Sequence, residues 1–257
     1  MPHNERAAES LARALEFMRA VLVSTADETR PISAGLVVRT PSLPAVWSAN
    51  QLRVTQPLGF DALLQLADEQ LPQLGYVDIA AEDQVAGQAL EPAFRAAGWK
   101  VQRDVIMVLS EPPDRLADTS IVADAREDEL MDLMDRWYAE DPGPSARERV
   151  ELVEYNRREV RVHGDRTLGV RSSDGRLVAI TKLRSDGSTA QVEDVYTVPE
   201  ARGRGYARAL VSRAAELARE DGAGLTFIVA DDNDWPRLLY GRIGFRPVGH
   251  VWHFHRP

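Results

Sequence analysis

Glycine and arginine gather in one short stretch of the sequence, residues 202–208. Two glycines lie among three basic residues, the set being Arg202, Gly203, Arg204, Gly205 and Arg208. Glycine has no Cβ, so an anion can approach the main chain closely at these positions. The N–H groups of a helix's first turn have no intrahelical acceptor and carry partial positive charge. With a helix beginning at this point, the stretch predicts a binding site for phosphate groups.

The residues on either side of this stretch have the patterns of a strand and a helix. Residues 192–198 are rich in β-branched and aromatic side chains, and Pro199 ends the run because proline cannot donate to a ladder. Apolar side chains then recur at helical spacing, at Ala207, Leu210, Val211, Ala214 and Leu217. The spacing fits neither a Walker phosphate loop nor the dinucleotide-binding fingerprint.

A second informative set of residues lies at 226–245. The apolar run 226–230 predicts a buried strand, and residues 235–242 predict a short helix that carries Tyr240 and ends before Gly244-Phe245. Asn233 lies between the strand and the helix. Residues 202–207 fit the R/Q-x-x-G-x-G/A signature, and with this second set they resemble the GNAT superfamily of acyl-CoA N-acyltransferases. The resemblance covers the chain well from Ile121 onward and the first half only weakly.

The resemblance implies acetyl-CoA as the cosubstrate and assigns roles to individual residues. The loop and the helix start would hold the pyrophosphate through Arg202, Gly203, Arg204, Gly205, Tyr206, Ala207 and Arg208. The main chain of Val195, Tyr196 and Thr197 would bind the pantetheine arm, although Thr197 stands where valine is usual. Asn233 is assigned to the cofactor, with an ordinary helix-cap role as the alternative. Tyr240 occupies the family's proton-donor position and would protonate or hydrogen-bond the leaving thiolate.

Transfer to an amine also needs a group that removes a proton. An alkylammonium has a pKa of about 10.4, so a carboxylate, often acting through water, commonly accepts its proton. Many relatives carry a glutamate where this chain has Ile228, which closes that route. Glu193, two residues after Gln191 on the strand before the phosphate loop, is therefore the candidate base. Asp194 is expected on the opposite strand face. A surface or ion-paired role for Glu193 stays open.

The rest of the chain alternates between helical and strand-like patterns. The expected helices cover residues 4–23, 60–71, 91–97, 127–138 and 145–160, with a turn at 141–144. The expected strands cover residues 35–39, 46–54, 75–80, 105–109, 120–123, 167–171, 177–184, 189–198 and 246–255. Trp137 and Trp235 could flank a pocket, although nothing in the sequence itself places them there.

The two halves of the chain resemble each other faintly. The strand–helix–Gly–aromatic series at 75–99 aligns with the series at 224–245, and Phe94 stands where the second series has Tyr240. The proline pair in Glu111-Pro112-Pro113-Asp114 indicates a linker. We therefore predict an α/β (α+β) fold of two GNAT-like domains, each with a mixed, mostly antiparallel sheet flanked by helices. Residues 1–115 would be a degenerate domain without a phosphate loop, and residues 116–257 the acetyl-CoA-binding domain.

Composition narrows the classes of function. A net charge of −9 argues against a general binder of nucleic acids or anionic membranes. No signal-peptide pattern or apolar run of about 18 residues is present, and the lack of cysteine fits a reducing compartment, so a cytoplasmic protein is expected. His253 and His255 share a face of the last strand, but no further ligand is identifiable, so no metal site is predicted.

These observations favour an N-acetyltransferase that moves an acetyl group from acetyl-CoA to a primary amine by direct attack in a ternary complex. With no cysteine in the chain, no cysteinyl acyl intermediate can form. The acceptor would be a small-molecule or peptide amine. A CoA-binding regulator or sensor without turnover is the alternative. A further alternative is an assembly role in which the first half provides a partner surface, and a homodimer is left open.

Overall fold

The computed structural model describes residues 3–71, 75–140 and 144–256. The helices are α1 (His3–Thr25), α2 (Phe60–Gln70), α3 (Gln84–Ala96), α4 (Glu127–Glu140), α5 (Ala146–His163), α6 (Tyr206–Glu220) and α7 (Pro236–Ile243), with 3₁₀ turns η1 (Trp47–Ala49) and η2 (Pro199–Ala201). The strands are β1 (Glu28–Ile32), β2 (Gly35–Arg39), β3 (Gln51–Val54), β4 (Val77–Ala81), β5 (Lys100–Leu109), β6 (Val122–Asp124), β7 (Arg166–Arg171), β8 (Leu177–Ser185), β9 (Thr189–Thr197), β10 (Leu225–Asp231) and β11 (Phe245–Arg256).

All the strands join one open sheet, in the order β1-β2-β3-β4-β11-β5-β10-β9-β8-β7-β6. The pairs β3–β4 and β9–β10 are parallel, and the other neighbouring pairs are antiparallel. In both parallel pairs a helix connects the two strands, as a parallel connection requires. The predicted fold class, a mixed and mostly antiparallel sheet flanked by helices, is confirmed.

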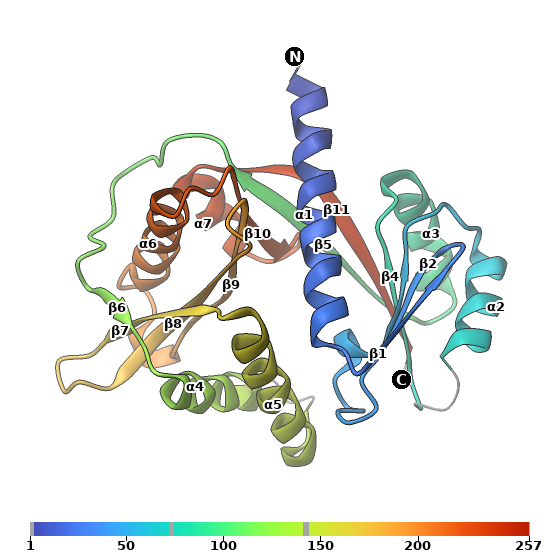
Figure 1. Cartoon of the computed structure of the whole chain (residues 1–257), viewed down its shortest axis with the longest axis horizontal. Helices are drawn as coiled ribbons and strands as arrows, with labels where there is room; N and C mark the ends of the chain where they lie inside the picture. The colour runs from blue at the N-terminus through green and yellow to red at the C-terminus, as the bar shows by residue number, and fades with distance from the viewer. Residues whose placement is uncertain (1–2, 72–74, 141–143, 257) are drawn as a thin grey trace.

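The centre of the sheet combines strands from both ends of the chain. β5 pairs with β10 on one side and with β11 on the other, and β11 also pairs with β4. The segment β3-α2-β4-α3-β5 therefore has the same order of elements as β9-α6-β10-α7-β11, and each segment's last strand lies beside a strand of the other segment (Figure 1). Both α3 and α7 end at a glycine with positive φ, Gly98 and Gly244, which a side chain would strain.

Helices cover both faces of the sheet. On one face, α6 and α7 pack against β7 to β10, while α2 and α3 pack against β3, β4 and β11. On the other face, α1 crosses the central strands β5 and β11, and α4 packs on β8 and β9 (Figure 1). The buried pair Phe17 and Phe227 joins α1 to β10. Because an N-terminal helix packs on a C-terminal strand, the division into domains 1–115 and 116–257 stays a prediction.

Most expected elements occur near their expected places, and the differences have local causes. β1 was not expected because its strand pattern is weak and includes Pro31, which an edge strand tolerates. The expected strand 46–54 is instead the 3₁₀ turn η1 followed by β3. α3 begins seven residues before the expected start at Glu91, because the Asp83 side chain accepts a hydrogen bond from Ala86 N–H and caps it. Residues 141–143 of the expected turn lie outside the described residues. No helix in the described ranges has the length and apolarity to cross a bilayer.

Candidate active site

The predicted anion site is a loop followed by the N-terminus of α6. Gly203 and Gly205 have φ values of 77° and 83°, in the left-handed region that favours glycine. A Cβ added at either position would have no atom within 4 Å, so this side of the loop is open. Within the described part of the chain, the N–H groups of residues 203–205 donate to no main-chain carbonyl. The first-turn N–H groups of α6 add to this set of free donors, which fits a diphosphate.

A cavity of about 480 Å³ extends from this loop to β9 and α7. Most of the predicted cofactor residues line it, as does the predicted proton donor: Val195, Tyr196, Thr197, Arg202, Gly203, Gly205, Tyr206, Ala207, Arg208 and Tyr240. Arg204 and Asn233 do not line the cavity and are exposed at its margin, Asn233 beside the lining residue Asp234. Glu193 lines a different cavity, on the opposite face of the sheet.

The loop arginines are less free than the sequence suggests. Arg202 pairs with Glu140 of α4 at 2.6 Å, and Arg208 pairs with Asp114 at 2.7 Å. The buried Arg208 keeps its Nε without a hydrogen-bond partner in the described residues. In the same described ranges Arg204 has no carboxylate within ion-pair distance and contacts only the Glu200 carbonyl, at 3.4 Å. Main-chain N–H groups therefore provide most of the unpaired donors around the loop.

The strands β9 and β10 separate beside the cavity. Their pairing ends at Ile228 opposite Val192, although both strands continue. Here β9 carries a bulge, because two residues, Asp194 and Val195, lie opposite Thr181 of β8, and Asp194 has a φ of 53°. Glu193 is the first residue of β9 beyond this pairing.

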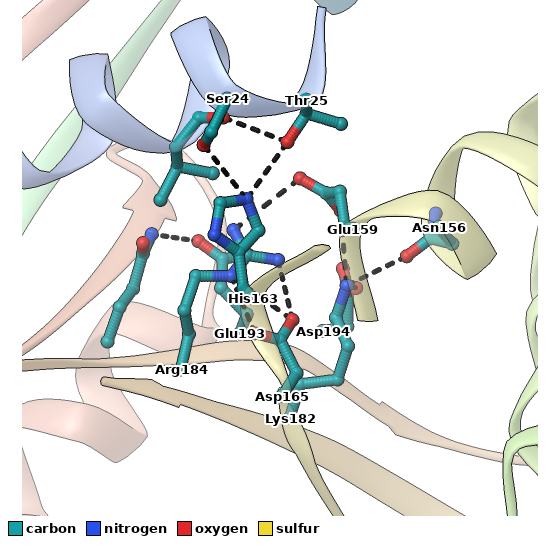
Figure 2. A network of polar contacts seen from close by, with 12 residues as sticks. Ser24, Thr25, Asn156, Glu159, His163, Asp165, Lys182, Arg184, Glu193 and Asp194 are labelled. Carbon is teal, nitrogen blue, oxygen red and sulfur yellow. Dashed lines mark hydrogen bonds and ion pairs between the residues drawn. The ribbon is translucent and has the colours of Figure 1, made fainter. Parts of the chain in front are cut away.

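The bulge corrects the prediction that Asp194 points away from Glu193. Lys182 of β8 lies directly opposite Glu193, so the two side chains share a face. The Lys182 ammonium group also contacts Asp194, at 2.6 Å, so Asp194 reaches the same face. Both carboxylates therefore lie on the face that α5 covers (Figure 2). Strict alternation fails because the extra residue of a bulge breaks the two-residue period.

These carboxylates belong to a buried polar network that the sequence did not predict. Lys182 also approaches Glu159 of α5 at 3.2 Å, and Arg184 holds Asp165 at 2.7 Å (Figure 2). Among the described residues, Glu193 has no cation within ion-pair distance, and it accepts a hydrogen bond from Gln191. Burial, together with the neighbouring charge of Asp194, raises the pKa of Glu193 to about 8, while Arg184 and Lys182 act in the opposite direction.

Tyr240 of α7 packs in the core and also lines the cavity. The residue is 6% exposed, and its ring meets Phe245 edge-on at 6.5 Å. Burial raises the pKa of Tyr240, and the charges of Glu193 and Asp234 add to the effect. Tyr240 is protonated at neutral pH and can donate a hydrogen bond.

Two tryptophans, which the sequence alone could not place at a pocket, line the cavity beside the glycine-rich loop. Trp137 of α4 stacks on Tyr196 of β9 with ring centroids 5.1 Å apart and an angle of 10°. Trp235 precedes α7 and is 62% exposed at the mouth. The helical pattern of α4 shows which residues face its core, but only the packing of α4 on β9 shows that Trp137 reaches the cavity.

The fold and the site define an α/β protein whose sheet opens beside a glycine-rich loop with free main-chain N–H groups at a helix N-terminus. Residues 128–245 match the family model described as "Acetyltransferase (GNAT) family". These residues therefore form a GNAT acetyltransferase domain, as the resemblance implied.

Solved structures show how far the fold is shared. A GCN5-related N-acetyltransferase from Kribbella flavida is similar over 96% of this chain and 95% of its own, with a TM-score of 0.61 and 20% identity. A functionally unknown conserved protein from Staphylococcus epidermidis is similar over 88% of this chain and 92% of its own, with a TM-score of 0.65 and 13% identity. These likenesses show the fold alone, and they extend into the first half. No curated protein matches the sequence.

Proposed function

We propose that the protein transfers an acetyl group from acetyl-CoA to a primary amine. One observation supports the proposal: residues of the glycine-rich loop, residues 195–197 of β9 and Tyr240 line one cavity, and the β9 residues in it lie beyond the point where β9 stops pairing with β10. Glu193, which lines the cavity on the other face of the sheet, directly follows the last residue of β9 that pairs with β10. In the proposal, Tyr240 acts from one face of the sheet and Glu193 from the other.

In this proposal, main-chain N–H groups of residues 203–207 hold the diphosphate, and the side of β9 that β10 leaves unpaired, at residues 195–197, binds the pantetheine arm. The Thr197 carbonyl already accepts a hydrogen bond from Arg202 Nε, at 3.1 Å. The exposed Asn233 contributes from the margin of the cavity. Acetyl-CoA supplies an activated acetyl group. The diphosphate is assigned to main-chain N–H groups because the guanidinium groups of Arg202 and Arg208 are already paired with carboxylates.

The chain's own groups would act on two protons. Glu193 in its ionised form removes a proton from the ammonium group of the acceptor, directly or through water. Tyr240 donates a hydrogen bond to the sulfur that leaves. Because the pKa of Tyr240 is raised, hydrogen bonding to the thiolate is favoured over full proton transfer. The attack is direct, since the chain has no cysteine to carry an acyl group.

We also propose that residues 1–115 are a degenerate GNAT-like domain and residues 116–257 the acetyl-CoA-binding one. The equal order of elements in β3-α2-β4-α3-β5 and β9-α6-β10-α7-β11 supports this division. Phe94, in the position of Tyr240, is fully buried and stacks on Phe254 at 4.0 Å. The first half therefore lacks the hydroxyl group that the reaction needs.

The proposal is tested by calorimetry with acetyl-CoA and by thiol release with a panel of primary amines. We expect binding of acetyl-CoA and amine-dependent release of free coenzyme. Binding without turnover across the panel would favour the regulatory alternative, in which the protein senses the coenzyme. A protein that binds neither acetyl-CoA nor free coenzyme would contradict both.

The raised pKa of Glu193 predicts a pH profile. A carboxyl group with a pKa near 8 is mainly protonated at pH 7, and it accepts a proton only when ionised. We therefore expect kcat/KM to rise with pH through about 8, and Glu193→Gln to lower kcat/KM by about 10- to 100-fold at pH 9. This rise of kcat/KM near pH 8, the limb of the pH profile, should disappear in Glu193→Gln.

The ionisation of the amine itself contributes to both profiles, so the comparison uses the same acceptor for both proteins. Asp186→Asn, in the exposed turn before β9, is the matched control and should retain the limb. A Glu193→Gln protein with an unchanged limb would exclude Glu193 as the base.

A further inference from the structure

A second cavity, of about 350 Å³, lies on the face of the sheet that α1 partly covers. It is lined by residues of both halves of the chain, among them Gln51 and Arg53 of β3, Asp104 of β5, Glu193 of β9 and His253 of β11. Glu193 is its link to the reaction proposed above. The residues of β3 have no role in that reaction, although they are among the most buried polar groups of the protein.

The end of this cavity at β9 is rich in carboxylates. Glu159 and Glu193 line it with Arg184, and Asp165, Lys182 and Asp194 belong to the same polar network (Figure 2). Carboxylates outnumber cations in this network even while Glu193 is protonated, and ionisation of Glu193 adds a further negative charge. Such a surrounding favours the ammonium end of a ligand.

At the end at β3, the charged lining residue is a cation, Arg53. Arg53 and Arg19 share one carboxylate, Glu82, whose side chain is 4% exposed. Arg53 uses Nε for this contact, and its Nη2 is buried without a partner in the described residues. Oε1 of the neighbouring Gln51 is likewise buried and unpartnered there. Buried polar atoms normally have hydrogen-bond partners, so a free donor beside a free acceptor calls for a ligand.

The free atoms define which ligand groups fit. A buried guanidinium N–H group without a partner fits a carboxylate, and the Gln51 carbonyl accepts an N–H group such as that of a peptide bond. β3 and β9 are five strand spacings apart in the sheet, about 24 Å at ~4.8 Å per spacing. Long side chains shorten this gap, yet a single α-amino acid cannot reach both ends.

We propose that the acceptor is a short peptide, or a peptide-like amine, with a free carboxylate that Arg53 binds while its amino group faces Glu193. Gln51 accepts a hydrogen bond from the peptide N–H next to the carboxylate. The first half of the chain thereby selects the acceptor that the second half acetylates. This inference rests on the proposed transfer to amines, but its binding step does not need turnover.

The test compares alanine peptides of two to five residues with their C-terminal amides. With acetyl-CoA present, we expect kcat/KM for the preferred length to be at least tenfold higher with the free carboxylate than with the amide. Arg53→Lys removes Nη2 and keeps a cation beside Glu82, so it should abolish most of this preference by raising KM. Arg19→Met is the matched control: it also removes a partner of Glu82, but from α1 and outside the cavity, and it should retain the preference.

Calorimetry of the same peptides against the protein saturated with free coenzyme gives a readout without turnover. We expect the free-carboxylate peptide to bind to the native protein and to Arg19→Met, and to bind at least tenfold more weakly to Arg53→Lys. Equal binding or turnover of carboxylate and amide, or no binding of any of the peptides, would overturn the inference. Failure of the proposed function is distinguishable, because it appears as loss of coenzyme binding or of thiol release with every amine.

Discussion

Replacement of Tyr240 by phenylalanine should lower kcat by about 10²- to 10⁴-fold, the range that a positioned proton donor contributes. The substitution removes one oxygen atom and keeps the ring, which is packed against Phe245 in the core. The affinity for acetyl-CoA should change little, because the hydroxyl group would act on the leaving sulfur and not on the diphosphate. Stopped assays of thiol release would measure kcat, and calorimetry would measure Kd.

The control for this experiment is Tyr155→Phe. Tyr155 is a buried tyrosine of α5, 7% exposed, and it does not line the cavity of the phosphate loop. Both variants should unfold at similar temperatures, and only Tyr240→Phe should lose turnover. Retention of native kcat by a folded Tyr240→Phe protein would remove Tyr240 from the mechanism.

The second large effect is expected from Gly205→Val, which should weaken acetyl-CoA binding by about 100-fold. A side chain at a φ of 83° costs about 1–2 kcal/mol, and the open space in front of the loop, which the diphosphate would occupy, becomes filled. Hydrogen bonds to a charged group are worth about 1.5–3 kcal/mol each, and every 1.4 kcal/mol is tenfold in Kd. The loss of one or two such bonds accounts for the expected change.

Gly222→Val separates this effect from strain alone. Gly222 follows the C-terminal end of the same helix, has a φ of 88° and also has no atom within 4 Å of an added Cβ. Both substitutions should lower the unfolding temperature by similar amounts, but Gly222→Val should leave the Kd for acetyl-CoA unchanged. Equal affinities of the two variants would show that the loop does not hold the coenzyme.

The glycine-rich loop before α6 could be predicted from the sequence because its signals are local. Two glycines among arginines, a proline that ends a strand and a helical stripe from Ala207 to Leu217 all act within a few residues of one another. Most of the residues predicted to bind the cofactor line one cavity, and their binding of acetyl-CoA stays a prediction. The family match over residues 128–245 agrees with the two motifs that carried the resemblance.

The positions of the carboxylates could not be predicted in this way. Whether Asp194 faces Glu193 depends on a bulge, which arises from the register between β8 and β9. The pairing of Arg208 with Asp114 likewise joins residues 94 positions apart. A period of two residues describes an isolated strand, whereas a bulge is a property of the pair of strands.

The sequence by itself determined the order of the elements, the loop that suits phosphate groups and the tyrosine on the helix behind it. These features depend on steric preferences and hydrogen bonds between residues near one another in the chain. Only the tertiary structure decided that β5 and β11 join the two halves into one sheet, and that Arg53 and Glu193 line one cavity. Contacts between distant segments are selected by the burial of whole faces, and no short stretch of sequence contains that information.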